Sequence, residues 1–296
     1  ILSLTHRLGW SLIGIALLLA FPTACRADEL PSSSAVSITQ DSATVDAADL
    51  EPLLTDVVYL GERHDSARDH GAQLDIIEAL YTEDPDMAIA MEMFQRPFQP
   101  VIDRYLAGEI SEDELVAGTE YEQRWGFPWE FYAPIVRFAK EKDIPLLALN
   151  APAEVTRQVA REGLESLEEP DFRYIPPLED IDVTNESYQA FVMAAFGAHG
   201  SHGNFNFDNF FAAQVIWDET MAATVAEFKQ ASPQTRVVVL AGSGHVMYGY
   251  GIPSRVARRL EDIDQTLVLL NPVDEVAGEA EVADVLWFSP AETSSP

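Results

Sequence analysis

The stretch Val57-Val58-Tyr59-Leu60-Gly61-Glu62-Arg63-His64 places an apolar run, typical of a buried strand, directly before a glycine and a histidine. A second stretch repeats this arrangement, since the apolar residues 237–241 precede Gly242-Ser243-Gly244-His245. In an open parallel sheet, ligands and catalytic groups gather at the carboxyl ends of the strands. Glycine lets the backbone turn sharply at such a strand end. We therefore expect His64 and His245 to meet in one crevice.

The apolar runs and the segments between them predict an α/β fold. Short apolar runs indicate buried strands over 57–60, 87–93, 144–149, 236–241, 266–270 and 282–288. Helical spacing of apolar residues falls between these runs, over 74–80, 131–138, 210–228 and 256–263. This alternation predicts a mainly parallel central sheet with right-handed crossovers, flanked by helices. The stretches 94–127 and 165–207 are too long for simple loops, so we expect helical insertions that form a lid over the site.

The N-terminal region has the pattern of an export signal. Two basic residues precede an apolar run over 8–21, and small residues follow, which predicts a signal peptide over 1–27. Cys25 is the only cysteine, so the chain can form no internal disulfide. Its position indicates a lipidated cysteine, which would make the protein an outer-membrane lipoprotein facing the periplasm. Cleavage after Ala27, which would release a soluble periplasmic protein, is the competing interpretation.

The remaining chain divides simply. Residues 28–50 are rich in Ser, Ala and Asp without periodicity, which predicts a flexible tether. We expect one α/β domain over 51–290 and a disordered tail over 291–296.

The chain is strongly acidic, with a net charge of −31 from 49 acidic and 18 basic residues. Such a surface repels polyanions, which argues against nucleic acid and anionic membranes as partners. The acidic residues are spread along the whole sequence, so our hypothesis is adaptation to a saline exterior.

Two side chains at strand ends are the strongest candidates for chemistry. His64 lies where the first strand ends and a helix begins, and Asp65 can cap that helix. Glu92 ends an apolar strand, where burial of a carboxylate is costly unless it contacts a cation, a histidine or a metal. Glu92 is therefore a candidate general acid/base or metal ligand. An ion pair with Arg96 or Arg124 is the alternative.

Other side chains carry weaker signals. His199 and His202 have a spacing compatible with metal binding, but glycines flank them in a loop. Tyr248 follows His245 closely, and a deprotonated tyrosine is a known axial ligand of ferric haem. Tyrosine at a glycine-rich turn is also an ordinary packing residue. Arginines near strand ends either bind propionates or neutralise neighbouring acids, and these are Arg63, Arg68, Arg96 and Arg124.

Six motif blocks in order resemble those of ChaN-like proteins, which are bacterial iron-regulated, haem-binding lipoproteins of the wider Tiki/TraB and erythromycin-esterase-like superfamily. The blocks are LGERHD (60–65), MEMF (91–94), RWGFPW (124–129), ALNAP (148–152), WDETMA (217–222) and AGSGHV (241–246). The resemblance spans nearly all of residues 53–262. It implies an α/β domain with helical additions, acting in haem or iron uptake at the cell envelope.

The resemblance also implies partners and site residues. Haem would be held by a tyrosine, with histidine assistance across a homodimer, and an outer-membrane haem receptor would be a further partner. The motifs match His64, Glu92 and His245 to site residues of the family, and Arg124 lies in a matched block. Tyr248 is the expected haem tyrosine and Tyr132 is its rival.

Three functions stay open from the sequence. The first is a haem-binding protein using Tyr248, His64, His245 and Arg124. The second is a metal-dependent hydrolase, in which His64 and His245 bind a divalent transition metal or move a proton while Glu92 positions the attacking water. The third is a sequestering or scaffold lipoprotein that kept the fold and lost the chemistry.

Overall fold

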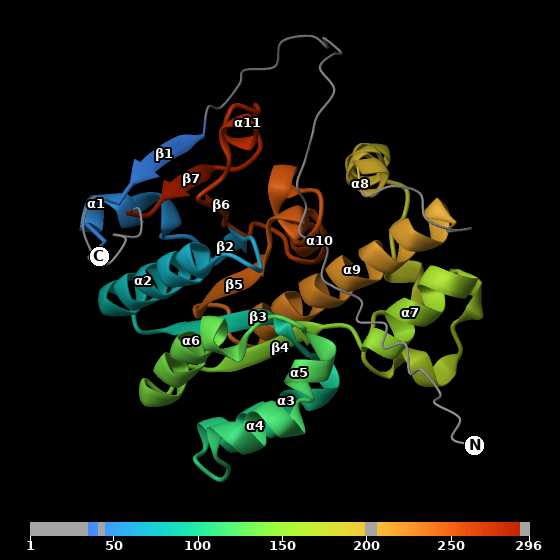
Figure 1. Ribbon diagram of the computed structural model, residues 1–296, viewed down its shortest axis with the longest axis horizontal. Helices are drawn as coiled ribbons and strands as arrows, with labels where there is room; N and C mark the ends of the chain where they lie inside the picture. Colours follow the sequence, from blue (N-terminus) through green and yellow to red (C-terminus); the bar gives the residue numbers. More distant parts are fainter. Residues whose placement is uncertain (1–34, 41–44, 199–205, 291–296) are drawn as a thin grey trace, which may run out of the picture.

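A parallel β-sheet forms the centre of the molecule. The computed structural model describes residues 35–40, 45–198 and 206–290. Within these residues, seven strands form one sheet in the order β1-β7-β6-β2-β5-β3-β4, and every neighbouring pair is parallel. Helices lie on both faces of the sheet (Figure 1). The predicted α/β class with a parallel sheet is therefore confirmed.

The strands are β1 Val36–Thr39, β2 Val57–Glu62, β3 Met87–Gln95, β4 Leu146–Asn150, β5 Arg236–Gly242, β6 Gln265–Leu270 and β7 Val285–Phe288. The α-helices are α1 Ala47–Leu50, α2 Ala67–Glu83, α3 Gln99–Leu106, α4 Glu112–Gly118, α5 Tyr121–Arg124, α6 Trp129–Glu141, α7 Ala153–Glu162, α8 Glu186–Ala198, α9 Phe207–Ala231, α10 Ile252–Arg259 and α11 Asp274–Ala277. Short 3₁₀ turns lie at Glu51–Leu53, Arg96–Phe98, Leu164–Ser166, Glu169–Arg173, Leu178–Asp180, Ser243–His245 and Met247–Gly249.

The expected strands all form, but the predicted tether over 28–50 is wrong in part. Within it, Val36–Thr39 forms β1 and pairs in register with β7, and Ala47–Leu50 forms α1. The strand escapes sequence analysis because it is four residues long and buries only Ile38, so its periodicity is too short to read. The predicted signal peptide with Cys25, His199, His202 and the tail over 291–296 lie outside the described residues.

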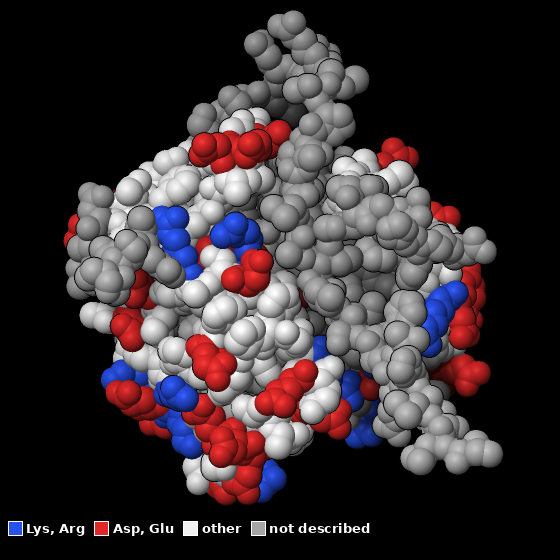
Figure 2. Space-filling model, in the orientation of Figure 1, with Lys and Arg blue, Asp and Glu red and all other residues white. Residues whose placement is uncertain are grey.

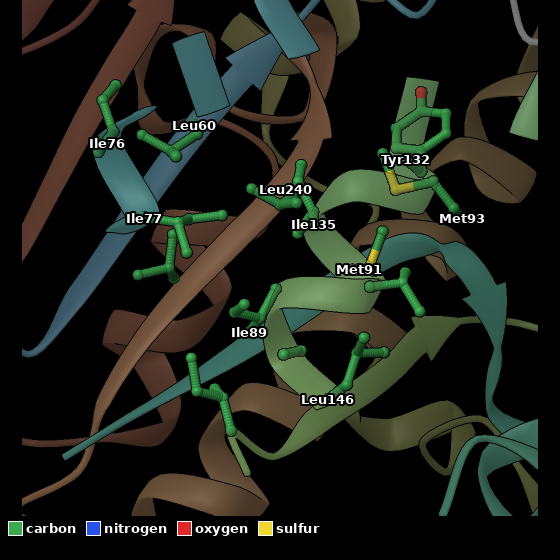
Figure 3. Packing of buried hydrophobic residues seen from close by; sticks show 14 of the residues in the cluster. Leu60, Ile76, Ile77, Ile89, Met91, Met93, Tyr132, Ile135, Leu146 and Leu240 are labelled. Carbon is green, nitrogen blue, oxygen red and sulfur yellow. The ribbon is translucent and has the colours of Figure 1, made fainter. Parts of the chain in front are cut away.

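The side chains of the central strands alternate between two cores. Val58 and Leu60 of β2 belong to the cluster that includes α2 and α6, whereas Val57 and Tyr59 belong to the cluster with α9 and α10. Such alternation is intrinsic to a strand, and burial on both faces explains the continuous apolar runs. Figure 3 shows the first of these cores, with Leu60 facing the helix that carries Ile76 and Ile77.

Helix boundaries near the site follow local hydrogen bonds. Helix α2 begins after Ser66, whose hydroxyl accepts a hydrogen bond from the backbone N–H of Asp69. Asp65 is therefore not the cap that we expected. Asn206 caps α9, a helix of 25 residues, through the backbone N–H of Asp208.

The two long insertions are largely helical, as predicted. The first contains α3, α4 and α5, and its last residues, Trp125 and Phe127, pack against His64. The second contains 3₁₀ turns and α8. Helix α8 contributes Tyr188 and Phe191 to the edge of the sheet where β5 ends.

The surface reflects the acidic composition. Acidic side chains are spread over the visible face of the described residues, with basic side chains between them (Figure 2). None of the described helices combines the length and the apolar character that a membrane crossing requires.

The pairing of β1 with β7 predicts that Ile38 contributes to stability. Ile38 is 5% exposed whereas Val36 on the same strand is 50% exposed. We expect Ile38→Ala to lower the free energy of unfolding by about 2 kcal/mol, since it leaves a cavity against β7. Val36→Ala is the matched control, with an expected change within about 0.5 kcal/mol. Urea denaturation measures both, and equal values would mean that this segment is a tether after all.

Candidate active site

The site lies at the carboxyl ends of β2, β3 and β5, which are neighbours in the sheet. Glu62, the last residue of β2, is paired with Gly242, the last residue of β5. His64 lies two residues after the end of β2, and His245 ends the 3₁₀ turn after β5. A methyl group added to Gly242 would lie 2.8 Å from the His64 ring and 3.7 Å from Glu92 Oε2. The structure thus brings His64, Glu92 and His245 together.

Glu92 occupies the centre of this group and is buried. Its Oε2 accepts a hydrogen bond of 2.8 Å from the backbone N–H of Gly242, and its Oε1 lies 3.5 Å from His245 Nε2. Arg96 and Arg124, the alternative partners considered for Glu92, form ion pairs with other residues. Arg96 pairs with Glu227 at 2.8 Å, and Arg124 contacts Gln95, Glu120 and Glu154. The compensation for burying Glu92 therefore comes from imidazoles and a backbone amide.

The ring of His64 is held by Glu62. Nδ1 of His64 lies 2.8 Å from Glu62 Oε1, which also accepts a hydrogen bond of 2.5 Å from the hydroxyl of Tyr132. Glu62 Oε2 accepts a hydrogen bond of 2.6 Å from the Gln73 amide and lies 3.4 Å from His70 Nδ1. All of these side chains are buried, so Glu62 does not face solvent.

Asp218 holds the ring of His245 in the same way as Glu62 holds that of His64. Nδ1 of His245 lies 2.7 Å from Asp218 Oδ1, and Asp218 Oδ2 accepts a hydrogen bond of 2.6 Å from the hydroxyl of Tyr188. Asp218 comes from α9, and its side chain is fully buried. Nδ1 of each of these two histidines therefore contacts a carboxylate, and each carboxylate accepts a hydrogen bond from a tyrosine hydroxyl.

These contacts set the charges of the site. Burial alone would lower the pKa of His245, but Glu92 and Asp218 raise it from 6.5 to about 10. Burial also opposes the charged form of His64, yet Glu62 and Glu92 raise its pKa above the ordinary value. Burial would raise the pKa of Glu92, and the two imidazoles lower it instead. The pKa of about 10 makes His245 an imidazolium at neutral pH, and the raised pKa of His64 favours its charged form beside the Glu92 carboxylate.

Aromatic side chains form the walls around the histidines. Trp125 packs edge-on against His64 with ring centroids 4.7 Å apart, and Phe127 lies 5.1 Å from the same ring. Trp217 lies 6.3 Å from His245. His64, Glu92 and His245 are buried beside these rings, and low exposure to water strengthens the electrostatic interactions of charged groups.

The two candidate haem tyrosines differ in their surroundings. Tyr132 is buried, and its hydroxyl donates a hydrogen bond to Glu62. Tyr248 is half-buried in the turn Met247–Gly249, with its ring 5.3 Å from Tyr250 and 5.6 Å from Phe191. Among the described residues, the hydroxyls of Tyr248 and Tyr250 have no hydrogen-bond partner. Burial and Glu279 raise the pKa of Tyr248 to about 12.

The donor atoms suit a transition metal by type, but not by arrangement. Because Glu62 and Asp218 occupy both Nδ1 atoms, the Nε2 atoms of His64 and His245 and the Glu92 carboxylate are what the site offers as ligands. In the part of the chain that the structure describes, no cluster of His, Cys, Asp and Glu side chains has the geometry to hold a metal ion. The metal site at His64, Glu92 and His245 stays a prediction.

The sequence did not indicate that Asp218, Tyr132 and Tyr188 support the two histidines. Asp218 lies within the buried run Asp218-Glu219-Thr220, which interrupts the apolar residues in the middle of helix α9. Polar residues on the buried face of a helix are costly, so this run is a signal that could have been read. Tyr132 and Tyr188 gave no such signal, because tyrosine is common in ordinary cores.

The raised pKa of His245 predicts how stability depends on pH. The folded-state pKa of about 10 exceeds the ordinary value of 6.5, so the stabilisation is fully present below pH 6.5 and is lost as the pH rises towards 10. We expect the free energy of unfolding to fall across this range. In His245→Gln the fall should be smaller, with a remainder from His64 and His70, whose pKa values are also raised. Chemical denaturation at a series of pH values measures both slopes, and identical slopes would contradict the assignment.

Comparison with known proteins agrees with this architecture. A solved structure entitled "Cofacial heme binding to ChaN of Campylobacter jejuni" shares the fold with a TM-score of 0.60 at 19% identity, covering 81% of this chain and 92% of that one. An erythromycin esterase mutant in its open conformation is more distant, with a TM-score of 0.44 and 14% identity over 75% of this chain and 70% of that one.

Sequence comparison adds a curated relative and a family. Protein RETICULATA-RELATED 5, chloroplastic, of Arabidopsis thaliana is 27% identical over 257 residues, which cover 81% of this chain and 35% of that protein. This chain thus spans about a third of the length of that relative. The family model described as "Haem-binding uptake, Tiki superfamily, ChaN" matches residues 53–256. The chain therefore belongs to the ChaN family of haem-binding uptake proteins in the Tiki superfamily.

Proposed function

We propose that this protein binds haem, and that Tyr248 supplies the ligand to the iron. The observation that carries the proposal is the family match over residues 53–256, which contain β2, β3 and β5, the three strands whose ends form the site. The solved ChaN structure from Campylobacter jejuni, which shares this fold, is described as binding haem cofacially. Haem binding is thus supported by the family to which this chain belongs.

The surroundings of Tyr248 fit a flat, apolar ligand. Its ring stacks with Tyr250 and contacts Phe191, so the turn after His245 and helix α8 together present aromatic surface. Ferric iron accepts phenolate oxygen as an axial ligand. The raised pKa of Tyr248 opposes the phenolate in the free protein, and a bound cation would reverse this because it stabilises the anionic oxygen.

The other residues expected to assist haem binding, His64, His245 and Arg124, are already paired with carboxylates. His245 and His64 contact carboxylates on Nδ1 and lie beside Glu92. They would therefore support haem binding indirectly, by holding neighbouring groups, and not as ligands of the iron. Arg124 is paired with Glu120 and Glu154, and a haem propionate would have to replace one of these carboxylates.

The setting of this function is part of the proposal. The predicted signal over 1–27 and the family description support haem or iron uptake at the cell envelope, with the protein exported as an outer-membrane lipoprotein or a soluble periplasmic protein. Cofacial haem binding in the Campylobacter jejuni protein supports a homodimer that brings two haems face to face. An outer-membrane haem receptor would be the partner that delivers or accepts haem.

Haem titration tests the ligand. We expect Tyr248→Phe to weaken haem binding at least about tenfold and to change the Soret and charge-transfer bands, because the phenolate ligand is lost. Tyr250→Phe is the matched control, since it removes a hydroxyl from the neighbouring stacked ring, and its spectrum should match that of the unchanged protein. Equal spectra and affinities in all three proteins would reject Tyr248, and absence of any Soret shift in the unchanged protein would reject haem binding.

A second candidate function rests on the charges around Glu92. A carboxylate between two imidazoles is an arrangement for acid–base hydrolysis: Glu92 takes a proton from the attacking water, and protonated His245 gives one to the leaving group. In the metal-dependent form of this hypothesis, His64, His245 and Glu92 would hold the ion, which would activate the water. The walls of Trp125, Phe127 and Trp217 would favour a substrate with apolar parts.

Hydrolysis of a p-nitrophenyl ester tests this second function. We expect Glu92→Gln to lower kcat by about 10²- to 10⁴-fold, the usual contribution of a general base. Glu227→Gln, which changes an exposed glutamate paired with Arg96, should leave kcat unchanged. Metal analysis of the purified protein and a chelator control separate the two forms. Equal turnover by all three proteins would eliminate Glu92 as the base.

A further inference from the structure

The site contains two series of hydrogen bonds, each running from a tyrosine through a carboxylate to a histidine. The two series come from different parts of the fold. In one, Tyr132 contacts Glu62 and Glu62 contacts His64. In the other, Tyr188 contacts Asp218 and Asp218 contacts His245. His245 Nε2 lies 3.5 Å from Glu92 Oε1, and the His64 ring and Glu92 both lie against Gly242. We propose that Tyr188 and Asp218 are positioning residues, which fix the His245 ring so that its Nε2 faces Glu92. The proposal deepens the acid–base function above and rests on it for its kinetic readout.

The geometry leaves His245 one satisfactory orientation. Asp218 uses Oδ1 for the ring nitrogen at 2.7 Å and Oδ2 for the Tyr188 hydroxyl at 2.6 Å, so both of its oxygens are engaged. Gln214 donates a further hydrogen bond of 3.3 Å to the same hydroxyl. Asp218 is fully buried, and turning the ring away would leave its carboxylate oxygen without that partner. Charge-assisted bonds of this length are strong and directional.

The surroundings hold this series of hydrogen bonds rigidly. A methyl group on Gly251 would lie 2.3 Å from the His245 carbonyl oxygen and 2.9 Å from Asp218 Oδ1, so only glycine allows the turn to approach α9 this closely. Arg255 donates hydrogen bonds to the carbonyl oxygens of Tyr250 and Gly251, and its guanidinium lies 5.3 Å from the centre of the Tyr188 ring. The tyrosine, the turn and the helix are therefore fixed to one another.

This series of hydrogen bonds also explains why the Tyr188 hydroxyl is buried. The Tyr188 ring already packs against Phe191, Phe211 and Tyr250, and a phenylalanine would fill this position as well. The hydroxyl adds the bond to Asp218. A buried hydroxyl is favourable only with a partner, so its contribution lies in orienting that carboxylate.

The orientation can be measured without haem or turnover. We would label the full chain with ¹⁵N-histidine and assign the ring signals with His64→Gln and His245→Gln. Tyr188→Phe should shift the ring nitrogen and Nδ1–H signals of His245 and leave those of His64 in place. Tyr132→Phe is the matched control and should do the reverse. Asp218→Asn should abolish the hydrogen-bonded Nδ1–H signal of His245, because the anionic acceptor is lost.

Each outcome decides the proposal. Signals of His245 that stay unchanged in Tyr188→Phe and Asp218→Asn would overturn it, and so would equal shifts of both histidines in either tyrosine variant. With the p-nitrophenyl ester, Asp218→Asn should lower kcat at least tenfold with KM within about twofold. If the unchanged protein hydrolyses no ester, the acid–base function fails while the histidine signals still decide whether Tyr188 and Asp218 position the ring.

Discussion

The burial of Glu92 at the carboxyl end of β3 is the constraint on which the site depends. A carboxylate in that position is tolerated only if nearby groups compensate for the water it loses, and here two imidazoles and the N–H of Gly242 do so. The two buried imidazoles in turn need partners on Nδ1, and the carboxylates of Glu62 and Asp218 supply them. The tyrosine hydroxyls complete the set. Glu92 thus needs the two histidines, the histidines need Glu62 and Asp218, and these two carboxylates accept hydrogen bonds from the tyrosines.

The parallel sheet makes this arrangement geometrically available. Because β2, β5 and β3 are neighbours with matched register, their carboxyl ends bring residues from distant parts of the chain to one edge. Burial on both faces leaves these strands no solvent-exposed side, so polar residues concentrate at their ends. Gly242 then leaves the room that the His64 ring occupies.

The haem and hydrolase hypotheses concern different surfaces of the same edge. The charged centre at Glu92 is enclosed by Trp125, Phe127 and Trp217, whereas Tyr248 belongs to an aromatic surface shared with α8. Tyr188 borders both, since its ring lies 6.2 Å from Tyr250 and its hydroxyl binds Asp218. A ligand on the aromatic surface would therefore lie next to the residues that hold His245.

Local sequence patterns, namely apolar runs and glycine turns, were enough to predict the parallel sheet, six of its strands, and the importance of His64, Glu92 and His245. They did not reveal β1, whose four residues bury a single side chain, or the roles of Tyr132, Tyr188 and Asp218. Those roles arise from contacts between α6, α8 and α9 and the sheet edge. They become apparent in the folded molecule, since in the sequence a tyrosine that orients a carboxylate cannot be told from one that fills a core.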